Sequence, residues 1–251
     1  MKIVVVGGSG LIGRKLVALL SSRFHEVVVA SPSAGVNSIT GVGLDKALKG
    51  ADVVVDVTNP PSFDPQAVMD FFTKSTKNLL RAGLEAGVRH HVVLSIVGTD
   101  SLPGNGYFVA KAAQEKLVQE SGVPYSIVRA TQFMEFMGTI ADGASVNGEV
   151  RLSTANFQPI AADDLAALLA DVAAYFPLNR IIDAAGPDRG RMCDLIGGYL
   201  TSIGDPRVVM PDPDAGYFGC PLSENSLVPQ GDGRIGSLTI EKWKERAKIA
   251  A

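Results

Sequence analysis

The chain has 251 residues, of which 46% are hydrophobic, and its 23 Lys+Arg against 26 Asp+Glu give a formal net charge of −3. A chain of this length buries roughly 70% or more of its unfolded surface, so one core can form without disulfides or a structural metal. The near-neutral charge, with no run of Lys or Arg, argues against nucleic-acid binding. No apolar run approaches the roughly 18 residues of a membrane span.

The first residues argue against export as well. The apolar run after Lys2 reaches Gly7 after four residues, which is too short for the core of a signal peptide. We therefore expect a cytoplasmic protein whose partner is a small-molecule substrate, with no nucleic-acid or membrane partner. The spacing of His, Cys and carboxylate residues is not typical of a metal site, so we expect no metal. A homo-oligomer is compatible with the sequence, and the oligomeric state stays open.

Apolar runs of strand length alternate with longer segments of helical period. This alternation indicates repeated βαβ units, and hence an α/β fold with a doubly wound parallel sheet of the Rossmann type that is buried on both faces. The predicted strands lie at 3–6, 27–30, 53–57, 92–95, 126–129 and 180–184.

Helices are predicted between these strands, as the crossover connections. They lie at 11–22, 65–86, 107–121 and 163–175. The second has the clearest start, because Asp64 can cap its first turn and Pro65 suits the first helical position.

The regular pattern loosens after about residue 186, where Pro, Gly and Asp divide the chain into short pieces. We interpret this part as a small irregular lobe that belongs to a single dinucleotide-binding domain of residues 1–251. Segments 131–158 and 186–251 are predicted to form its substrate side.

The connection between the first strand and the first helix is rich in glycine. Its spacing satisfies both G-x-x-G-x-x-G and G-x-G-x-x-G. Glycines in this context allow a tight turn, a close approach of backbone N–H groups to a pyrophosphate, and close packing of the helix on the strand. We predict a dinucleotide site here, which includes Thr58 and Asn59 after the third strand. Its loop residues are Gly7, Gly8, Ser9, Gly10, Leu11, Ile12 and Gly13.

The end of the second strand bears on the choice of dinucleotide. An NAD site usually places Asp or Glu there, but this chain has Ser31 and Ser33 instead. The two hydroxyls could donate hydrogen bonds to a 2′-phosphate, and Arg14 could neutralise it. NADP(H) is therefore favoured over NAD(H). The alternative is that 31–33 is only a turn and Arg14 a solvated helix residue.

Three residues form a candidate acid–base site. Ser95 ends a predicted strand, and Tyr107 and Lys111 lie four residues apart at a predicted helix start, so both face the same side of that helix. An ammonium group near a phenol favours the phenolate and lowers the pKa of the phenol. We predict that Lys111 does this for Tyr107 and holds the nicotinamide ribose, and that Ser95 orients the substrate oxygen. The alternative is a surface helix with a solvated lysine.

The order of the glycine loop, Ser95, Tyr107-x-x-x-Lys111 and the segment 124–130 resembles the atypical, NmrA-like branch of the short-chain dehydrogenase/reductase superfamily. The resemblance covers roughly residues 1–175. It implies a Rossmann-type fold that binds NAD(P), and it matches Asn78 to a structural Asn that supports the active site. A helix-face Asn is the alternative for Asn78. Many NmrA-like members lack the Tyr and act as redox-sensing regulators, so the presence of Tyr107 and Lys111 favours an enzyme.

The residues after the fifth predicted strand are candidates for the substrate pocket. Phe133, Met134 and Phe136 follow it where ligands of open α/β folds bind, and they would suit an apolar pocket wall. Plain helix packing is the alternative. The sequence thus predicts an NAD(P)H-dependent oxidoreductase that acts on a small, largely apolar carbonyl, quinone or enone compound. A dinucleotide-sensing regulator that binds NAD(P) without turnover is the alternative function.

Overall fold

The computed structural model describes residues 1–231 and 233–249. Their contacts divide them into two compact units. The first unit comprises Met1–Ile96, Gly106–Arg129 and Leu165–Ile182, and the second comprises Val97–Asn105, Ala130–Asp164 and the described part of Asp183–Ala251. In this part of the chain every helix is too short or too polar to cross a lipid bilayer.

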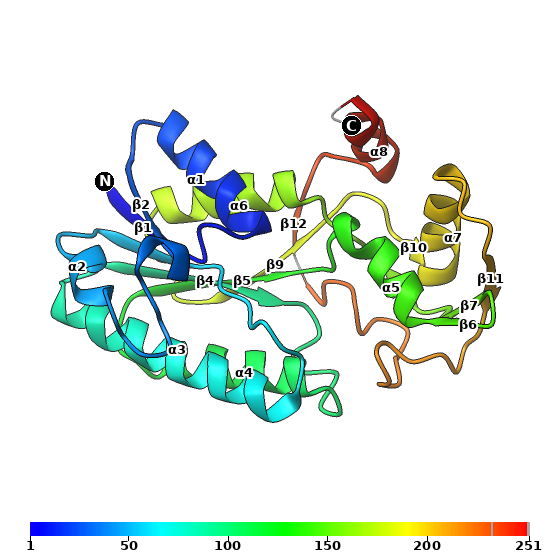
Figure 1. The fold of residues 1–251 in the computed structure, drawn as a ribbon, viewed down its shortest axis with the longest axis horizontal. Helices are drawn as coiled ribbons and strands as arrows, with labels where there is room; N and C mark the ends of the chain where they lie inside the picture. Colours follow the sequence, from blue (N-terminus) through cyan, green and yellow to red (C-terminus); the bar gives the residue numbers. More distant parts are fainter. Residues whose placement is uncertain (232, 250–251) are drawn as a thin grey trace. The chain divides into compact units, whose positions relative to one another are not determined.

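The main sheet has seven strands in the order β12-β9-β5-β4-β3-β1-β2. Because β1 lies between β2 and β3, the chain winds outward from β1 in both directions, which confirms the predicted doubly wound fold (Figure 1). All six predicted strands are present. The seventh, β12, has only two residues, too few for a pattern to indicate it. The strands are β1 Lys2–Val6, β2 Glu26–Ala30, β3 Val53–Asp56, β4 His90–Ile96, β5 Tyr125–Ala130, β9 Ile181–Ala185 and β12 Arg234–Ile235.

The strand β1 shows why these segments form a buried parallel sheet. It pairs in parallel with β2 on one side and β3 on the other, so that Val4 lies opposite both Val28 and Val54. Residues 3–5 are fully buried. Helices cover both faces of the strand, which therefore carries apolar side chains on both faces rather than on alternate positions.

Four long helices pack on this sheet. Figure 1 shows α3 (Pro65–Glu85) and α4 (Gly106–Gln119) along one face, with α1 (Leu11–Ser22) and α6 (Ala162–Ala174) along the other. The predicted start of α3 is confirmed, since Asp64 Oδ1 accepts a hydrogen bond of 2.9 Å from the Ala67 N–H. A short helix, α2 (Leu44–Leu48), was not predicted.

The second unit is more regular than its sequence suggests. It contains α5 (Met137–Gly143), α7 (Met192–Ser202), α8 (Ile240–Ile249) and two small sheets. One sheet has the order β11-β7-β6, and the other pairs β10 with β8. Their strands are β6 Ser145–Val146, β7 Glu149–Leu152, β8 Asn156–Phe157, β10 Gly190–Arg191 and β11 Val208–Pro211.

The helix α7 was missed because it contains Gly197 and Gly198, which lower helix propensity by about 1 kcal/mol each. It forms nevertheless, because Met192, Ile196 and Leu200 recur every four residues and are buried along one side.

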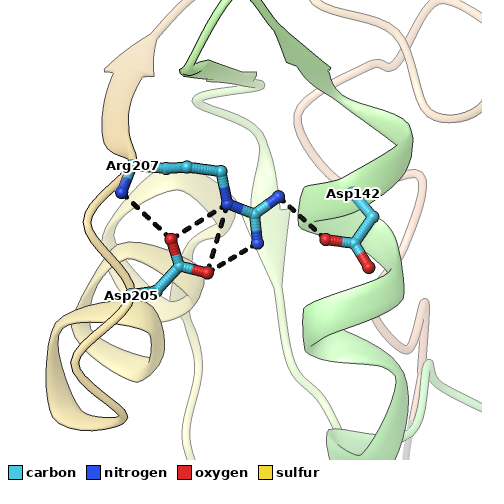
Figure 2. Close-up of polar contacts among 3 residues, drawn as sticks. All are labelled: Asp142, Asp205 and Arg207. Atoms are coloured by element: carbon cyan, nitrogen blue, oxygen red, sulfur yellow. Dashed lines mark hydrogen bonds and ion pairs between the residues drawn. The ribbon is translucent and has the colours of Figure 1, made fainter.

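An ion-pair cluster holds part of the second unit together (Figure 2). The Arg207 guanidinium donates to both Asp205 oxygens, at 2.9 and 2.7 Å, and to Asp142 Oδ1 of α5 at 2.8 Å. These hydrogen bonds hold the pKa of Asp205 down at about 2. The cluster ties α5 to the segment that leads into β11.

We expect Arg207→Gln to lower the midpoint of thermal unfolding more than Arg151→Gln does, because Arg151 is exposed and pairs with its neighbour Glu149. The Asp205 carboxylate contributes stability above its unfolded pKa of about 3.9 and loses it as the pH falls toward about 2. The difference between parent and Arg207→Gln, measured by circular dichroism, should therefore shrink over that range. Equal effects of the two variants would contradict this assignment.

Candidate functional site

The glycine loop after β1 is built by close backbone contacts. Gly7 has a φ of +83°, and a Cβ there would lie 2.8 Å from the Val57 carbonyl oxygen. A Cβ at Gly13 would collide with the carbonyl oxygen of Gly7 and with the backbone of Gly8. The loop closes on itself through a hydrogen bond of 3.0 Å from the Gly10 N–H to the Gly7 oxygen. Side chains at positions 7 and 13 are therefore excluded by the backbone itself.

The first turn of α1 fits a pyrophosphate. The helix begins after Gly10, which has no side chain to cap it, and Ser9 and Gly10 are exposed. The N–H groups of Leu11 and Ile12 belong to the first turn, whose donors lack intrahelical acceptors and lie at the positive end of the helix dipole. This cradle suits the pyrophosphate of a dinucleotide, and that role of the loop stays a prediction.

We expect Gly13→Ala to lower the free energy of unfolding by about 1–3 kcal/mol or more, because the atoms that its Cβ meets are backbone and cannot turn away. Affinity for NADPH should fall with it. The matched control is Gly198→Ala in α7, where a Cβ meets open space, so stability should hold or rise. Urea denaturation and fluorescence titration with NADPH measure both quantities. Parent-like NADPH binding by Gly13→Ala would contradict the cradle.

The residues after β2 form a hydroxyl pair. Ser31 is buried, and its Oγ lies 3.0 Å from the Oγ of Ser33, which is exposed in the short 3-10 helix Pro32–Ala34. Arg14 is exposed on α1. The turn that was the alternative interpretation is present, and the 2′-phosphate role of these residues stays a prediction.

The residues after β3 form hydrogen bonds with the end of that strand and with α4. Thr58 donates from its N–H and its Oγ1 to Asp56 Oδ1, at 2.9 and 2.7 Å, which clamps the chain where β3 ends. Asn59 accepts a hydrogen bond from Tyr107.

The side chain of Asn78, on α3, donates to the carbonyl oxygens of Ser38 and Ile39. It therefore secures the 38–39 loop, and the expectation that it supports the active site is corrected.

The candidate acid Tyr107 lies in the first turn of α4. Its hydroxyl donates a hydrogen bond of 2.8 Å to Asn59 Oδ1. Its half-buried ring contacts Phe72, with centroids 5.7 Å apart, and Phe63 at 6.1 Å. Burial raises the pKa of the Tyr107 phenol above its usual range. The expectation that a neighbouring ammonium lowers this pKa is thus wrong for this structure.

The position of Lys111 explains why its ammonium group does not lower the pKa of Tyr107. Its Nζ donates to the Leu94 carbonyl oxygen and to Gln114 Oε1, each at 2.8 Å, rather than to Tyr107. It also lies 4.1 Å from the centroid of the Phe72 ring. Burial lowers the pKa of Lys111 to about 8, although the carboxylates of Asp56 and Glu115 oppose this shift. The ammonium group is directed into the protein, toward the sheet.

Ser95 belongs to a second buried group. Its Oγ donates a hydrogen bond of 2.5 Å to Glu115 Oε1, and Arg129 binds the same carboxylate through Nε at 2.9 Å and Nη2 at 2.6 Å. Because the hydroxyl hydrogen of Ser95 goes to Glu115, this arrangement does not present Ser95 as a donor to a substrate oxygen. The structure therefore does not bring Ser95, Tyr107 and Lys111 together as a hydrogen-bonded triad.

Sequence reasoning missed the acidic members of these groups, Asp56 and Glu115. A signal was available for Glu115, which follows Lys111 by four residues and so lies on the same side of α4. Asp56 Oδ2 accepts from Gln114 Nε2 at 3.0 Å, which connects β3 to the same helix.

We expect Glu115→Ala to destabilise the protein by about 3–5 kcal/mol, because it leaves the largely buried Arg129 without its carboxylate. Glu120→Ala on the same helix removes an exposed pair with Lys116, and should change stability by no more than about 0.5 kcal/mol. Urea denaturation compares the two variants. Similar losses would show that the buried pair does not anchor α4.

The predicted pocket wall lies in the second unit. Phe133 and Phe136 stack with their ring centroids 5.5 Å apart, whereas Met134 is fully buried. Their role toward a substrate stays a prediction.

A doubly wound parallel sheet whose first strand leads through a glycine cradle into a helix defines a Rossmann-type dinucleotide-binding protein. Residues 7–175 match the family described as NAD(P)H-binding, and the chain belongs to this family. It is thereby a member of the atypical short-chain dehydrogenase/reductase superfamily, as the resemblance indicated.

Curated relatives carry both enzyme and assembly-factor names. The chain is 30% identical over 164 residues to a (4-alkanoyl-5-oxo-2,5-dihydrofuran-3-yl)methyl phosphate reductase of Streptomyces griseus subsp. griseus, over 59% of this chain and 54% of the relative. It is 26% identical to the photosystem II assembly factor Ycf39 of Synechocystis sp., over 54% and 46%. It is 28% identical to a chloroplastic divinyl chlorophyllide a 8-vinyl-reductase of Cucumis sativus, over 74% and 53%. The chain thus spans about half the length of these relatives.

Among solved structures, the dTDP-4-dehydrorhamnose reductase of Bacillus anthracis in complex with NADP matches with a TM-score of 0.74 at 14% identity. The match covers 100% of this chain and 98% of that one. At this identity the similarity establishes the fold.

Proposed function

We propose that the chain is an NAD(P)H-dependent reductase of small, largely apolar carbonyl, quinone or enone compounds, with Tyr107 as the proton donor. The observation that carries the proposal is a tyrosine in the first turn of α4 whose hydroxyl donates to Asn59, in the same unit as the glycine cradle. Membership in the NAD(P)H-binding family and the two relatives named as reductases support it.

The chain's own residues would hold the dinucleotide at two places. The loop from Gly7 to Gly13 and the first turn of α1 would bind its pyrophosphate. Ser31, Ser33 and Arg14 would receive a 2′-phosphate, and we therefore favour NADP(H) over NAD(H). The bound nicotinamide supplies the hydride in this class of reaction.

The hydroxyl of Tyr107 is the donor in its hydrogen bond to Asn59, so it has a proton to give. A phenol is protonated at neutral pH and can give that proton to an oxygen that gains negative charge during hydride transfer. Burial raises the pKa of the phenol and so makes it a weaker acid than a free tyrosine. In this proposal Lys111 and Ser95 anchor β4 and α4 through their buried partners and so hold Tyr107 in place.

The names of the two reductase relatives favour unsaturated substrates, since one contains an alkanoyl dihydrofuranone and the other a vinyl group. Both names are consistent with the enone compounds of the proposed substrate class. The rings of Phe63 and Phe72 lie beside the Tyr107 ring and supply apolar surface next to the phenol.

The test is a binding titration with NADPH and NADH, followed by nicotinamide absorbance measurements with a panel of carbonyl, quinone and enone compounds. We expect tighter binding of NADPH and consumption with at least one compound. Tyr107→Phe should lower kcat by roughly a hundredfold or more, because proton donation is lost. Tyr175→Phe, which changes an exposed tyrosine after α6, is the matched control and should behave as the parent.

Two outcomes would contradict the reductase proposal. One is unchanged turnover in Tyr107→Phe. The other is tight NADPH binding without consumption across the panel, the behaviour of a dinucleotide-sensing regulator.

A further inference from the structure

The hydrogen bond between Tyr107 and Asn59 joins the two segments that meet at the candidate acid. Tyr107 comes from the first turn of α4, and Asn59 comes from the loop after β3. The phenol is the donor, and Asn59 Oδ1 is the acceptor at 2.8 Å. The hydrogen that Tyr107 would give to a substrate is therefore the one that Asn59 holds in the resting protein.

Asn59 is itself held on both sides. Thr58 is bonded twice to Asp56 Oδ1, and Pro60 is buried. Proline also restricts the backbone of the residue before it, so Asn59 has few conformations available. The amide is thus presented to the phenol by a clamped segment, although its side chain is exposed.

Lys111 is not placed to hydrogen-bond the Tyr107 phenol. Its Nζ donates hydrogen bonds to Leu94 and Gln114 and lies over the ring of Phe72. The partner that a Tyr-x-x-x-Lys pattern suggests is therefore engaged elsewhere, and the amide of Asn59 is in contact with the phenol instead.

We propose that Asn59 is the positioning residue for Tyr107, and that its amide hydrogen-bonds the Tyr107 oxygen both before and after the phenol loses its proton. This inference rests on the proposed function of Tyr107 as the proton donor. In the resting protein Asn59 Oδ1 orients the hydroxyl. When the phenol acts, its O–H bond breaks, the proton goes to the substrate oxygen, and the electron pair stays on the Tyr107 oxygen.

The phenolate that remains needs a donor, and the Asn59 amide can supply one. A half-turn about its Cβ–Cγ bond replaces Oδ1 by the Nδ2–H group, because the two ends of an amide have nearly the same shape. A hydrogen bond to a charged acceptor is roughly twice as strong as one between neutral groups. Water then returns the proton to the phenolate, and the amide turns back.

The test compares Asn59→Ala with Asn59→Asp. The aspartate keeps an acceptor for the phenol but has no N–H for the phenolate. If Asn59 served only to orient the neutral hydroxyl, Asp would restore activity. We expect instead that both variants lower kcat by roughly tenfold or more, with KM for the carbonyl substrate changed by no more than about threefold. Parent-like kcat in Asn59→Asp would overturn the proposal.

The matched control is Asn179→Asp. Asn179 Oδ1 also accepts a single hydrogen bond, of 3.1 Å from the Tyr125 N–H, but at the amino end of β5. The same chemical change at that edge of the sheet should leave kcat within about twofold of the parent. A comparable loss there would show that the effect of Asn59→Asp is not specific to Tyr107.

A double variant distinguishes failure of this inference from failure of the proposed function. If Asn59 acts through Tyr107, adding Asn59→Ala to Tyr107→Phe should cause no further loss of kcat. A further loss as large as that of Asn59→Ala alone would overturn the inference and leave Tyr107 as the donor. Unchanged turnover in Tyr107→Phe alone would overturn the proposed function itself.

A second readout does not depend on turnover. Urea denaturation of the two single variants and the double variant measures whether Asn59 and Tyr107 are coupled in the free energy of unfolding. We expect the two losses to be less than additive, because either variant alone breaks the same hydrogen bond. Additive losses would show that the bond does not exist in solution, and would overturn the proposal.

Discussion

The attachment of α4 to the sheet is the constraint on which the candidate acid depends. Two buried groups make this attachment: Lys111 and Gln114 bond to Leu94 and Asp56, and Glu115 bonds to Ser95 and Arg129. Each group pairs positive and negative charge, which compensates part of the cost of removing both from water. Tyr107 lies one helical turn before Lys111, so the orientation of α4 also sets the position of the phenol.

The glycine loop imposes a second constraint, of a steric kind. The backbone of Gly13 lies against that of Gly7, and Gly7 lies against Val57, so the loop, α1 and the segment after β3 form one packed set. The next residues in that segment are Thr58 and Asn59. The segment that packs against the glycine loop therefore also carries Asn59, the hydrogen-bond partner of Tyr107.

Much of the fold followed from local patterns. The strands appeared as apolar runs because a sheet covered on both faces needs apolar side chains at every position, and Asp64 and Pro65 predicted the start of α3 because capping acts over three or four residues. The second unit was harder to predict. Its strands have two to four residues, and α7 contains a Gly-Gly pair, so tertiary contacts rather than local preference stabilise these elements.

The sequence by itself determined the α/β alternation, the glycine loop, and the presence of Tyr107 and Lys111 on one side of a helix, because these depend on short-range spacing. Only the tertiary structure decided where the polar ends of the side chains lie. Lys111 donates a hydrogen bond to Leu94, and Ser95 donates one to Glu115. Tyr107 donates to Asn59, which is 48 residues away in the chain. The physical reason is that a buried donor or ammonium group bonds to the acceptor that folding brings within reach, and spacing along one helix does not contain that information.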